Sequence, residues 1–221
     1  PTTIPFSISG YYTMNRWDFF RSFATFFEDV TPSFLVQFEM YGGISLKSTL
    51  RNNSYSQLDY RIFGLEDDYY QIEDFTNIDT ADFTRFDGNS VAYTFKQNTL
   101  NRKQFSSSGS AFEFSARYVS GRETSYPGST SLLEDTISNR HNWLTFNSEF
   151  QLFPIDEKLF HLGVHGKGVW STQTLFANYT ASLLSSPSFD LIPDSKTFFL
   201  PEFRSPQFVG AGLNFIFSFN P

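Results

Sequence analysis

The sequence predicts an all-β protein, an antiparallel up-and-down transmembrane β-barrel of which about eight strands are present. Aromatic residues make up 19% of the 221 residues, and aromatic side chains are enriched in strands and at lipid interfaces. Apolar and polar residues alternate over long stretches, as they do in a strand with one apolar face. Long and short connections between these stretches alternate, which is typical of barrels in the outer membrane.

The stretch 90–118 carries this pattern most directly, because it contains two alternating segments around a polar turn at 98–109. In the second segment Phe112 and Phe114 share one face, whereas Glu113 lies on the other. In a soluble protein the apolar face would cover a core. In a membrane barrel it would contact lipid, and the polar face would line a wet interior.

The first predicted strand covers residues 6–15, and the aromatic-rich stretch 16–33 is interpreted as its extension, turning at Thr31 and Pro32. The second strand covers residues 34–47, where even-numbered positions are mainly apolar and odd-numbered positions mainly polar. At ~3.3 Å per residue this strand is roughly 43 Å long. That length exceeds a usual soluble strand and suits a tilted crossing of an apolar layer ~30 Å thick.

A tight turn at 51–54 leads to the third strand, which is predicted at 55–65. A long acidic loop is expected at 66–88, and the fourth strand at 90–97. Carboxylates crowd the expected loop, whereas apolar residues recur at every second position of both strands.

Four further strands are expected, with the same alternation, at 111–120, 142–153, 159–170 and 208–219. Their connections are expected to be a polar loop at 121–140, a short turn at 154–157 and a long loop at 171–207.

Strand alternation divides the candidate site residues into two sets. The apolar set is predicted to face lipid: Phe34, Val36, Phe38, Phe112, Phe114, Tyr118, Leu144, Phe146, Phe150, Leu213, Phe215 and Phe217. The polar set is predicted to face the barrel lumen: Gln37, Glu39, Lys47, Glu113, Arg117, Asn147, Glu149, His165 and Lys167. Opposite charges, such as Glu113 with Arg117 or Glu149 with Lys167, are expected to pair as structural contacts inside the lumen.

No cofactor, metal or catalytic residue is predicted. The carboxylates of 66–87 could ligate Ca²⁺, but they lack any EF-hand spacing, so a solvated acidic loop is the preferred interpretation. His161 and His165 share a strand face but lie ~13 Å apart at ~3.3 Å per residue, too far to share a metal ion. The chain contains no G-x-S-x-G motif for a nucleophilic serine.

Composition narrows the class of protein further. The net charge of −7, without a cluster of Lys or Arg, argues against a nucleic-acid partner. The chain has no Cys, and no apolar run is long enough for a transmembrane helix. It opens at Pro1 without a signal-peptide pattern and ends at Pro221 directly after a predicted strand. We therefore expect residues 1–221 to be one barrel segment cut from a longer chain.

Three other interpretations remain open from the residues alone. A complete small barrel, acting as an adhesin or structural protein, predicts that strand one pairs with strand eight. A barrel-embedded lipase predicts a Ser hydroxyl within hydrogen-bond reach of a His or Asp, with His141 as the only histidine in a long loop. A soluble β-sandwich or lipocalin-like barrel that serves as a binding module predicts an inward-facing apolar core.

Four parts of the chain carry a resemblance to a known family. They contain NRWDFFRS and FFEDVTPSFL in 15–35, NTLNRKQF and SARYVSGRE in 98–123, PGSTS at 127–131, and NYTASLLSSPSFDLIPDSKTFFLPEFRSPQFVGAGL at 178–213. In this order they resemble the C-terminal barrel of patatin-like phospholipases from Bacteroidota-type Gram-negative bacteria. That barrel is similar in plan to the surface-antigen and two-partner-secretion barrels.

The resemblance implies a cell outer membrane location and a role in anchoring or translocating an N-terminal patatin-like phospholipase domain. The implied partners are outer-membrane lipid and the lipase and periplasmic domains of the parent chain. It also implies a barrel of up to about sixteen strands, so that strands are missing on either side of this segment. The lipase serine and aspartate of the family have no counterpart here, so the segment itself is expected not to be an enzyme.

Overall fold

The computed structural model describes residues 5–19, 35–50, 53–72, 74–76, 78–102, 106–177, 186–187 and 204–217. The described strands form one 8-stranded antiparallel sheet, in which each strand pairs with the next along the chain. The strands are β1 (Phe6–Phe19), β2 (Leu35–Thr49), β3 (Ser54–Tyr69), β4 (Asp82–Asn98), β5 (Ser110–Tyr126), β6 (Ile137–Asp156), β7 (Phe160–Ser171) and β8 (Phe208–Phe217). The all-β, up-and-down architecture is confirmed. Within the described residues, no helix is long and apolar enough to cross a membrane.

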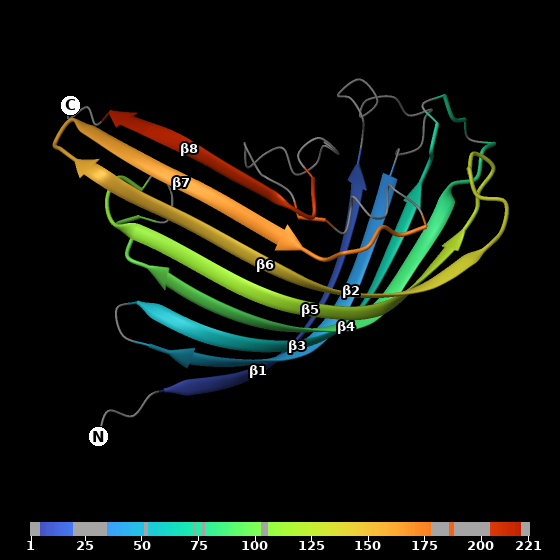
Figure 1. The fold of residues 1–221 in the computed structure, drawn as a ribbon, viewed down its shortest axis with the longest axis horizontal. Coiled ribbons are helices and arrows are strands. Elements are labelled where there is room, and N and C mark those ends of the chain that lie inside the picture. The colour runs from blue at the N-terminus through green and yellow to red at the C-terminus, as the bar shows by residue number, and fades with distance from the viewer. Residues whose placement is uncertain are drawn as a thin grey trace.

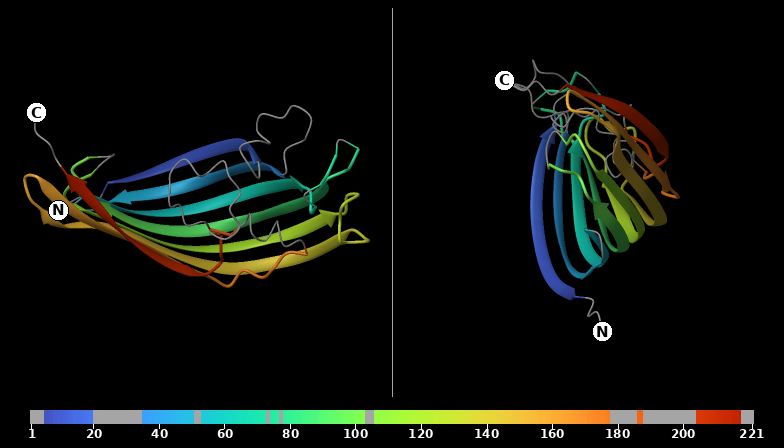
Figure 2. Two further views of the ribbon diagram at one scale, coloured as in Figure 1. Left: turned by 90° about the horizontal axis from the view of Figure 1, so that it is seen from above. Right: turned by 90° about the vertical axis from the view of Figure 1, so that its left-hand side faces the viewer.

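The sheet curves into an open trough with one convex and one concave face (Figure 1, Figure 2). β1 and β8 form its two edges, and within the described residues no pairing joins them. The sheet therefore does not close. The pairing of strand one with strand eight that a complete small barrel requires is absent from the described chain.

The registers keep side chains of one face in continuous rows across the strands. β2 and β3, for example, pair without interruption from Leu35 opposite Tyr69 to Thr49 opposite Tyr55. Because successive side chains in a strand point to opposite faces, an unbroken register carries the apolar and polar alternation of one strand onto the next.

The acidic loop expected at 66–88 is wrong in extent, because 11 of its 23 residues belong to strands and the connection covers only 70–81. β3 continues to Tyr69 and β4 begins at Asp82. The carboxylates on the strands have partners: Glu66 lies 3.2 Å from Arg85, and Asp67 accepts a hydrogen bond of 3.1 Å from Gln37. Partnered carboxylates are compatible with strand pairing, so the run of acidic residues did not mark a loop.

The polar loop expected at 121–140 is also wrong in extent, because β5 continues to Tyr126 and β6 begins at Ile137. Polar side chains on these extensions point into the concave face and bond to one another, as the Ser125 hydroxyl does to Glu123 at 2.9 Å. In this part of the sheet the buried polar side chains form hydrogen bonds with one another, so the strands continue without an alternation of apolar and polar residues.

The short turn expected at 154–157 begins too early. β6 continues to Asp156, and its register with β7 shifts between Leu152 and Ile155. Pro154 lies within this shift, where the hydrogen-bond ladder is interrupted and a residue without an N–H group is tolerated.

Short connections gather at one end of the sheet. The connections at 50–53 and 157–159 are short, and Asn53 adopts a left-handed φ of 53°. The polar turn at 99–109 lies at the same end, where Asn101 accepts hydrogen bonds from the Ser107 and Ser108 backbone N–H groups. Gly109 has a φ of 92°, and a Cβ there would lie 2.3 Å from the Thr99 carbonyl oxygen. The connections at the opposite end are 20–34, 70–81, 127–136 and 172–207.

Two small apolar clusters lie on the concave side near the end with the long connections. One contains Phe19, Leu35, Tyr69 and Phe75, and the other contains Phe86, Val119, Trp143 and Phe176. Apart from Ala92 and Val169, the buried apolar side chains of the described residues belong to these clusters, whereas a soluble β domain would need an apolar core along the length of the sheet.

Candidate functional site: the two faces of the sheet

The convex face carries the residues that were predicted to face lipid. The strand registers and alternation place Val36, Phe38, Phe112, Phe114, Tyr118, Leu144, Phe146, Phe150, Leu213, Phe215 and Phe217 on this face. Phe34 lies outside the described residues. The common face is thus established, and contact with lipid remains a prediction.

Large apolar side chains on this face are strongly exposed. Ile8 is 68% exposed, Leu213 58% and Phe215 61%. Ring contacts connect the strands across the face: Phe114 lies 6.5 Å from Phe146, which lies 5.7 Å from Trp170, between ring centroids. A continuous exposed apolar surface of this extent marks contact with another apolar phase or partner.

The concave face carries the residues that were predicted to face a lumen. Alternation and register place Gln37, Glu39, Lys47, Glu113, Arg117, Asn147, Glu149, His165 and Lys167 there. Glu149 lies directly opposite Lys167, as the expected pairing requires. The expected pair of Glu113 and Arg117 is wrong, because Glu113 bonds to Lys96 on the adjacent strand at 2.8 Å. Residues four apart in one strand are separated by ~13 Å, whereas cross-strand neighbours meet.

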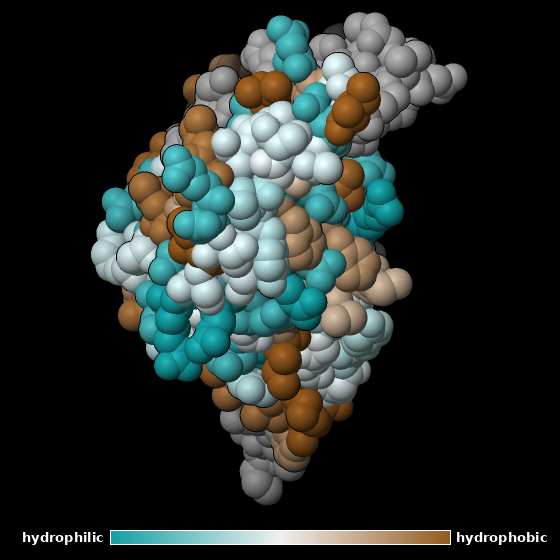
Figure 3. All heavy atoms as spheres, turned by 90° about the vertical axis from the view of Figure 1, so that its right-hand side faces the viewer, coloured by the Kyte–Doolittle hydropathy of each residue, from teal (hydrophilic) through white to brown (hydrophobic). Residues whose placement is uncertain are grey.

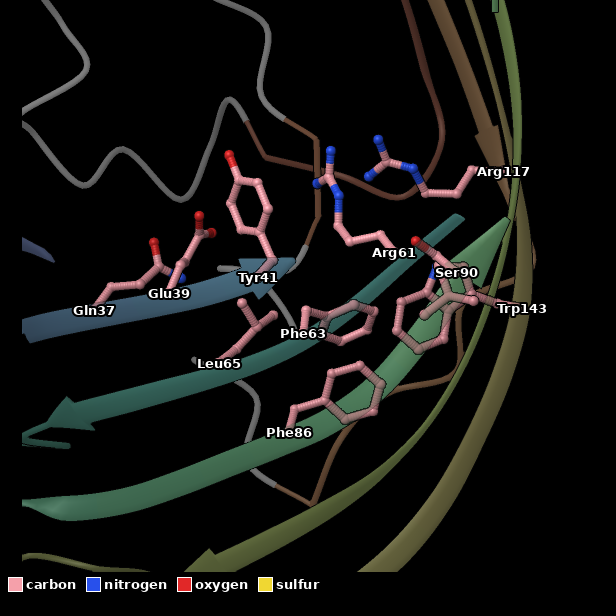
Figure 4. A pocket seen from close by; sticks show the side chains of 11 residues that line it. Gln37, Glu39, Tyr41, Arg61, Phe63, Leu65, Phe86, Ser90, Arg117 and Trp143 are labelled. Atoms are coloured by element: carbon pink, nitrogen blue, oxygen red, sulfur yellow. The ribbon is translucent and has the colours of Figure 1, made fainter. Parts of the chain in front are cut away.

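A hollow of about 170 Å³ lies in the middle of the concave face (Figure 4). The Arg61 guanidinium lies over the Tyr41 ring at 4.3 Å and donates a hydrogen bond of 3.4 Å to the Tyr11 hydroxyl. Phe63 and Phe86 contribute an apolar wall, with ring centroids 5.5 Å apart. The mixture of aromatic, cationic, carboxylate and amide groups suits a hydrated interior wall. Among the described residues, no hydrogen bond joins the Ser90 hydroxyl to a base.

A buried polar network lies beside this hollow, toward the long connections. The Glu123 side chain is 0% exposed, and its Oε2 lies 2.7 Å from the Nε2 of His141. His141 was expected in a long loop and instead lies in β6, with its ring buried on the concave side. The assignment of His141 to a loop is wrong for the same reason as the loop itself: the strands continue through polar residues.

This network holds the beginning of the last long connection against the concave wall. The Thr174 hydroxyl lies 2.9 Å from the Nδ1 of His141, and the Ala177 backbone N–H donates to Glu123 at 2.9 Å. The Phe176 ring packs 4.6 Å from the His141 ring and 5.0 Å from the Phe86 ring, between centroids. Residues 172–177 are therefore fastened inside the trough.

The interpretation as a barrel-embedded lipase predicts a Ser hydroxyl within hydrogen-bond reach of a His or Asp. The Ser129 hydroxyl does donate to Asp79 at 3.2 Å, so a contact of this kind is present between two connections. The contact at His141 is different. A threonine hydroxyl, rather than a serine hydroxyl, lies beside His141, and the carboxylate behind His141 also accepts from Ser125 and from a backbone N–H group. A buried carboxylate that accepts hydrogen bonds from three donors suits a structural role, in which Glu123 holds residues 172–177 in place. Sequence reasoning missed the network, although Glu123 and His141 continue the inward-facing alternation of their strands.

The remaining candidate ligands are dispersed. His161 bonds to Asp156 at 2.8 Å, whereas His165 lies opposite Gln151 and Gly212. Within the part of the chain that the structure describes, no group of three or more His, Asp or Glu side chains could hold a metal ion.

Comparison of the chain with family models finds no match, and neither the curated proteins nor the solved structures give a significant match. The resemblance to patatin-like phospholipases therefore stays a prediction. Much of its longest run, 178–213, lies outside the described residues. What the described residues define is a curved antiparallel sheet with an apolar convex face and a polar concave face.

Proposed function

We propose that this chain forms part of an outer-membrane β-barrel, with its convex face against lipid and its concave face toward the lumen. The observation that carries the proposal is the pairing of an exposed apolar convex face with a polar concave face on one curved, up-and-down sheet. Lipid offers no hydrogen bonds, so a sheet in a membrane must satisfy its own backbone groups by closing. Within the described residues, no strand pairs with the outer edge of β1 or β8, which supports closure by further strands. A total of up to about sixteen strands is implied by the family resemblance alone.

The proposed role is to anchor or translocate an N-terminal patatin-like phospholipase domain in the outer membrane of a Gram-negative bacterium, without catalysis by this segment. Support for the passenger comes from the residues of 15–35, 98–123 and 178–213 that resemble the family. Support for a non-catalytic segment comes from the absence of G-x-S-x-G and from the use of His141 and Glu123 as an anchor.

The role is tested in the full-length parent protein by deleting residues 1–221 and following phospholipase activity in separated membrane fractions. The proposal predicts activity in the outer-membrane fraction of the intact protein and its loss from that fraction after deletion, with the activity recovered elsewhere. Activity that stays in the outer membrane after the deletion would contradict an anchoring role. A parent chain without phospholipase activity would contradict the proposed N-terminal phospholipase domain.

A further inference from the structure

Two arginine side chains face each other across neighbouring strands on the convex face. Arg122 of β5 lies directly opposite Arg140 of β6, and both are exposed. Their strand neighbours Glu123 and His141 point the other way, into the concave face, where they are buried. The arginines therefore lie on the same face as the apolar side chains, near the end with the long connections, where hydrophilic side chains gather (Figure 3).

Within the described residues, no side chain of the adjacent strand forms an ion pair with either arginine. Asp87 of β4 is the register partner of Arg122, but its carboxylate lies 2.6 Å from the Nε of Arg85. Within the described residues, neither Arg122 nor Arg140 has an ion pair or hydrogen bond. Like charges directly opposite one another destabilise a strand pair, so an anion between them would relieve the repulsion.

The two arginines lie two outward-facing pairs beyond the apolar pair Tyr118 and Leu144 along β5 and β6. Tyr118 lies opposite Leu144, the next outward-facing pair is Ser120 with Asn142, and the one after it is Arg122 with Arg140. Four residues along a strand span ~13 Å, which for a strand tilted by ~45° is about 9 Å along the membrane normal. The headgroup region extends roughly 5–8 Å beyond the apolar layer, within reach of long arginine side chains.

We propose that Arg122 and Arg140 bind the phosphate group of an anionic lipid, of the phosphate-monoester class, in the leaflet that surrounds the long-connection end. This inference rests on the proposed membrane location. Two guanidinium groups can each form paired hydrogen bonds to phosphate oxygens, and a phosphate monoester carries enough negative charge for both. The phosphate of a zwitterionic lipid is already paired with its own ammonium group and fits less well.

The test is native mass spectrometry of the longest natural version of the protein in detergent, titrated with phosphatidic acid as the phosphate-monoester lipid. The Arg122→Gln/Arg140→Gln variant is expected to bind this lipid about tenfold more weakly than the unmodified protein. The Arg102→Gln/Lys158→Gln variant removes the same total charge. It is expected to change binding by less than about twofold, because Arg102 and Lys158 are exposed in connections at the opposite end of the sheet.

Equal weakening in both variants would overturn the inference, because it would indicate general electrostatic attraction. Equal binding of phosphatidylcholine, or displacement of phosphatidic acid by inorganic phosphate at equal concentration, would also overturn it. Insertion into neutral phosphatidylcholine vesicles is measured in parallel. If the protein inserts but does not prefer phosphatidic acid, only this inference fails; if it does not insert, the proposed membrane function fails and the inference with it.

Discussion

At the scale of single residues, Phe114 and Ser115 provide the sharpest contrast, because these neighbours in β5 point to opposite faces. If Phe114 lies near the middle of the bilayer, Phe114→Arg is expected to lower the free energy of unfolding in lipid by ~2–4 kcal/mol. Ser115→Arg is the matched control and is expected to cost much less, since Ser115 faces the polar side. Denaturant titration of both variants in vesicles measures the difference. Equal, small effects would show that the face assignment is wrong.

Glu123 gives a second residue-scale prediction, because it is fully buried and accepts from His141, Ser125 and the Ala177 N–H. Glu123→Ala leaves these donors without their acceptor and is expected to cost about 1–3 kcal/mol or more. The Ala177 amide is expected to exchange its hydrogen faster, because residues 172–177 lose their anchor. Glu134→Ala, at an exposed position of the 127–136 connection, is the control. Unchanged exchange at Ala177 would mean that Glu123 does not hold this segment.

The faces of individual residues could be predicted from sequence, whereas their partners could not. Alternation alone assigned Phe112 and Glu113 to opposite faces, because a strand reverses its side chains at every residue. The bond between Glu113 and Lys96 depends on the register of β4 with β5, and no pattern within one strand contains that register.

At the scale of elements, hydrogen bonds join the connections at 70–81 and 127–136. The Ser129 backbone N–H donates to the Thr80 carbonyl at 3.0 Å, and the Ser129 hydroxyl donates to Asp79 at 3.2 Å. Asp79 also accepts from the Thr76 backbone N–H at 2.8 Å. The 70–81 and 127–136 connections therefore form one contact surface at the end of β3, β4, β5 and β6.

The stability of the contact between these two connections is expected to depend on pH. The hydrogen bond from the Thr76 backbone, followed by that from the Thr76 hydroxyl, lowers the pKa of Asp79 below its ordinary value of 3.8. A carboxyl group whose pKa is lower in the folded state stabilises that state above its ordinary pKa, and this stabilisation is lost as the pH falls through the folded-state pKa.

Amide hydrogen exchange at Thr76 and Ser129 should therefore quicken as the pH falls below about 4, relative to that of core amides in β5. Asp79→Asn should remove this extra pH dependence and leave exchange faster than in the unmodified protein above about pH 4. The same acid sensitivity in the Asn variant would contradict the role of Asp79.

The sequence correctly predicts the parts of the strands in which apolar and polar residues alternate. It wrongly assigns the polar extensions of these strands to loops. The predicted bounds of β3 and β4 are too short because a run of acidic residues is typical of a solvated loop, whereas Glu66 and Asp67 have partners on neighbouring strands. Composition cannot distinguish a solvated carboxylate from one that is paired across a sheet, since the partner is distant in sequence.

At the scale of the whole molecule, the exposed convex face and the sheet edges, which have no partner strand within the described residues, have a common explanation in the proposed barrel. An open sheet edge is not stable in the apolar part of a bilayer, where each unpaired backbone group costs several kcal/mol. The proposed barrel therefore requires further strands to pair with β1 and β8. The number of those strands follows only from the family resemblance, because an open sheet of given curvature does not fix where it closes.

The central claim is that the convex face of this sheet contacts lipid. The most direct test is a cysteine-accessibility scan of residues 111–120 in the longest natural version of the protein in lipid, since the present chain has no native Cys. We expect even-numbered positions to react only with lipid-soluble reagents and odd-numbered positions with aqueous ones, except Val119, which is buried against Phe86 and Trp143 and should react with neither. If even-numbered positions are hidden from both kinds of reagent, the apolar face is covered by protein and the membrane barrel is contradicted.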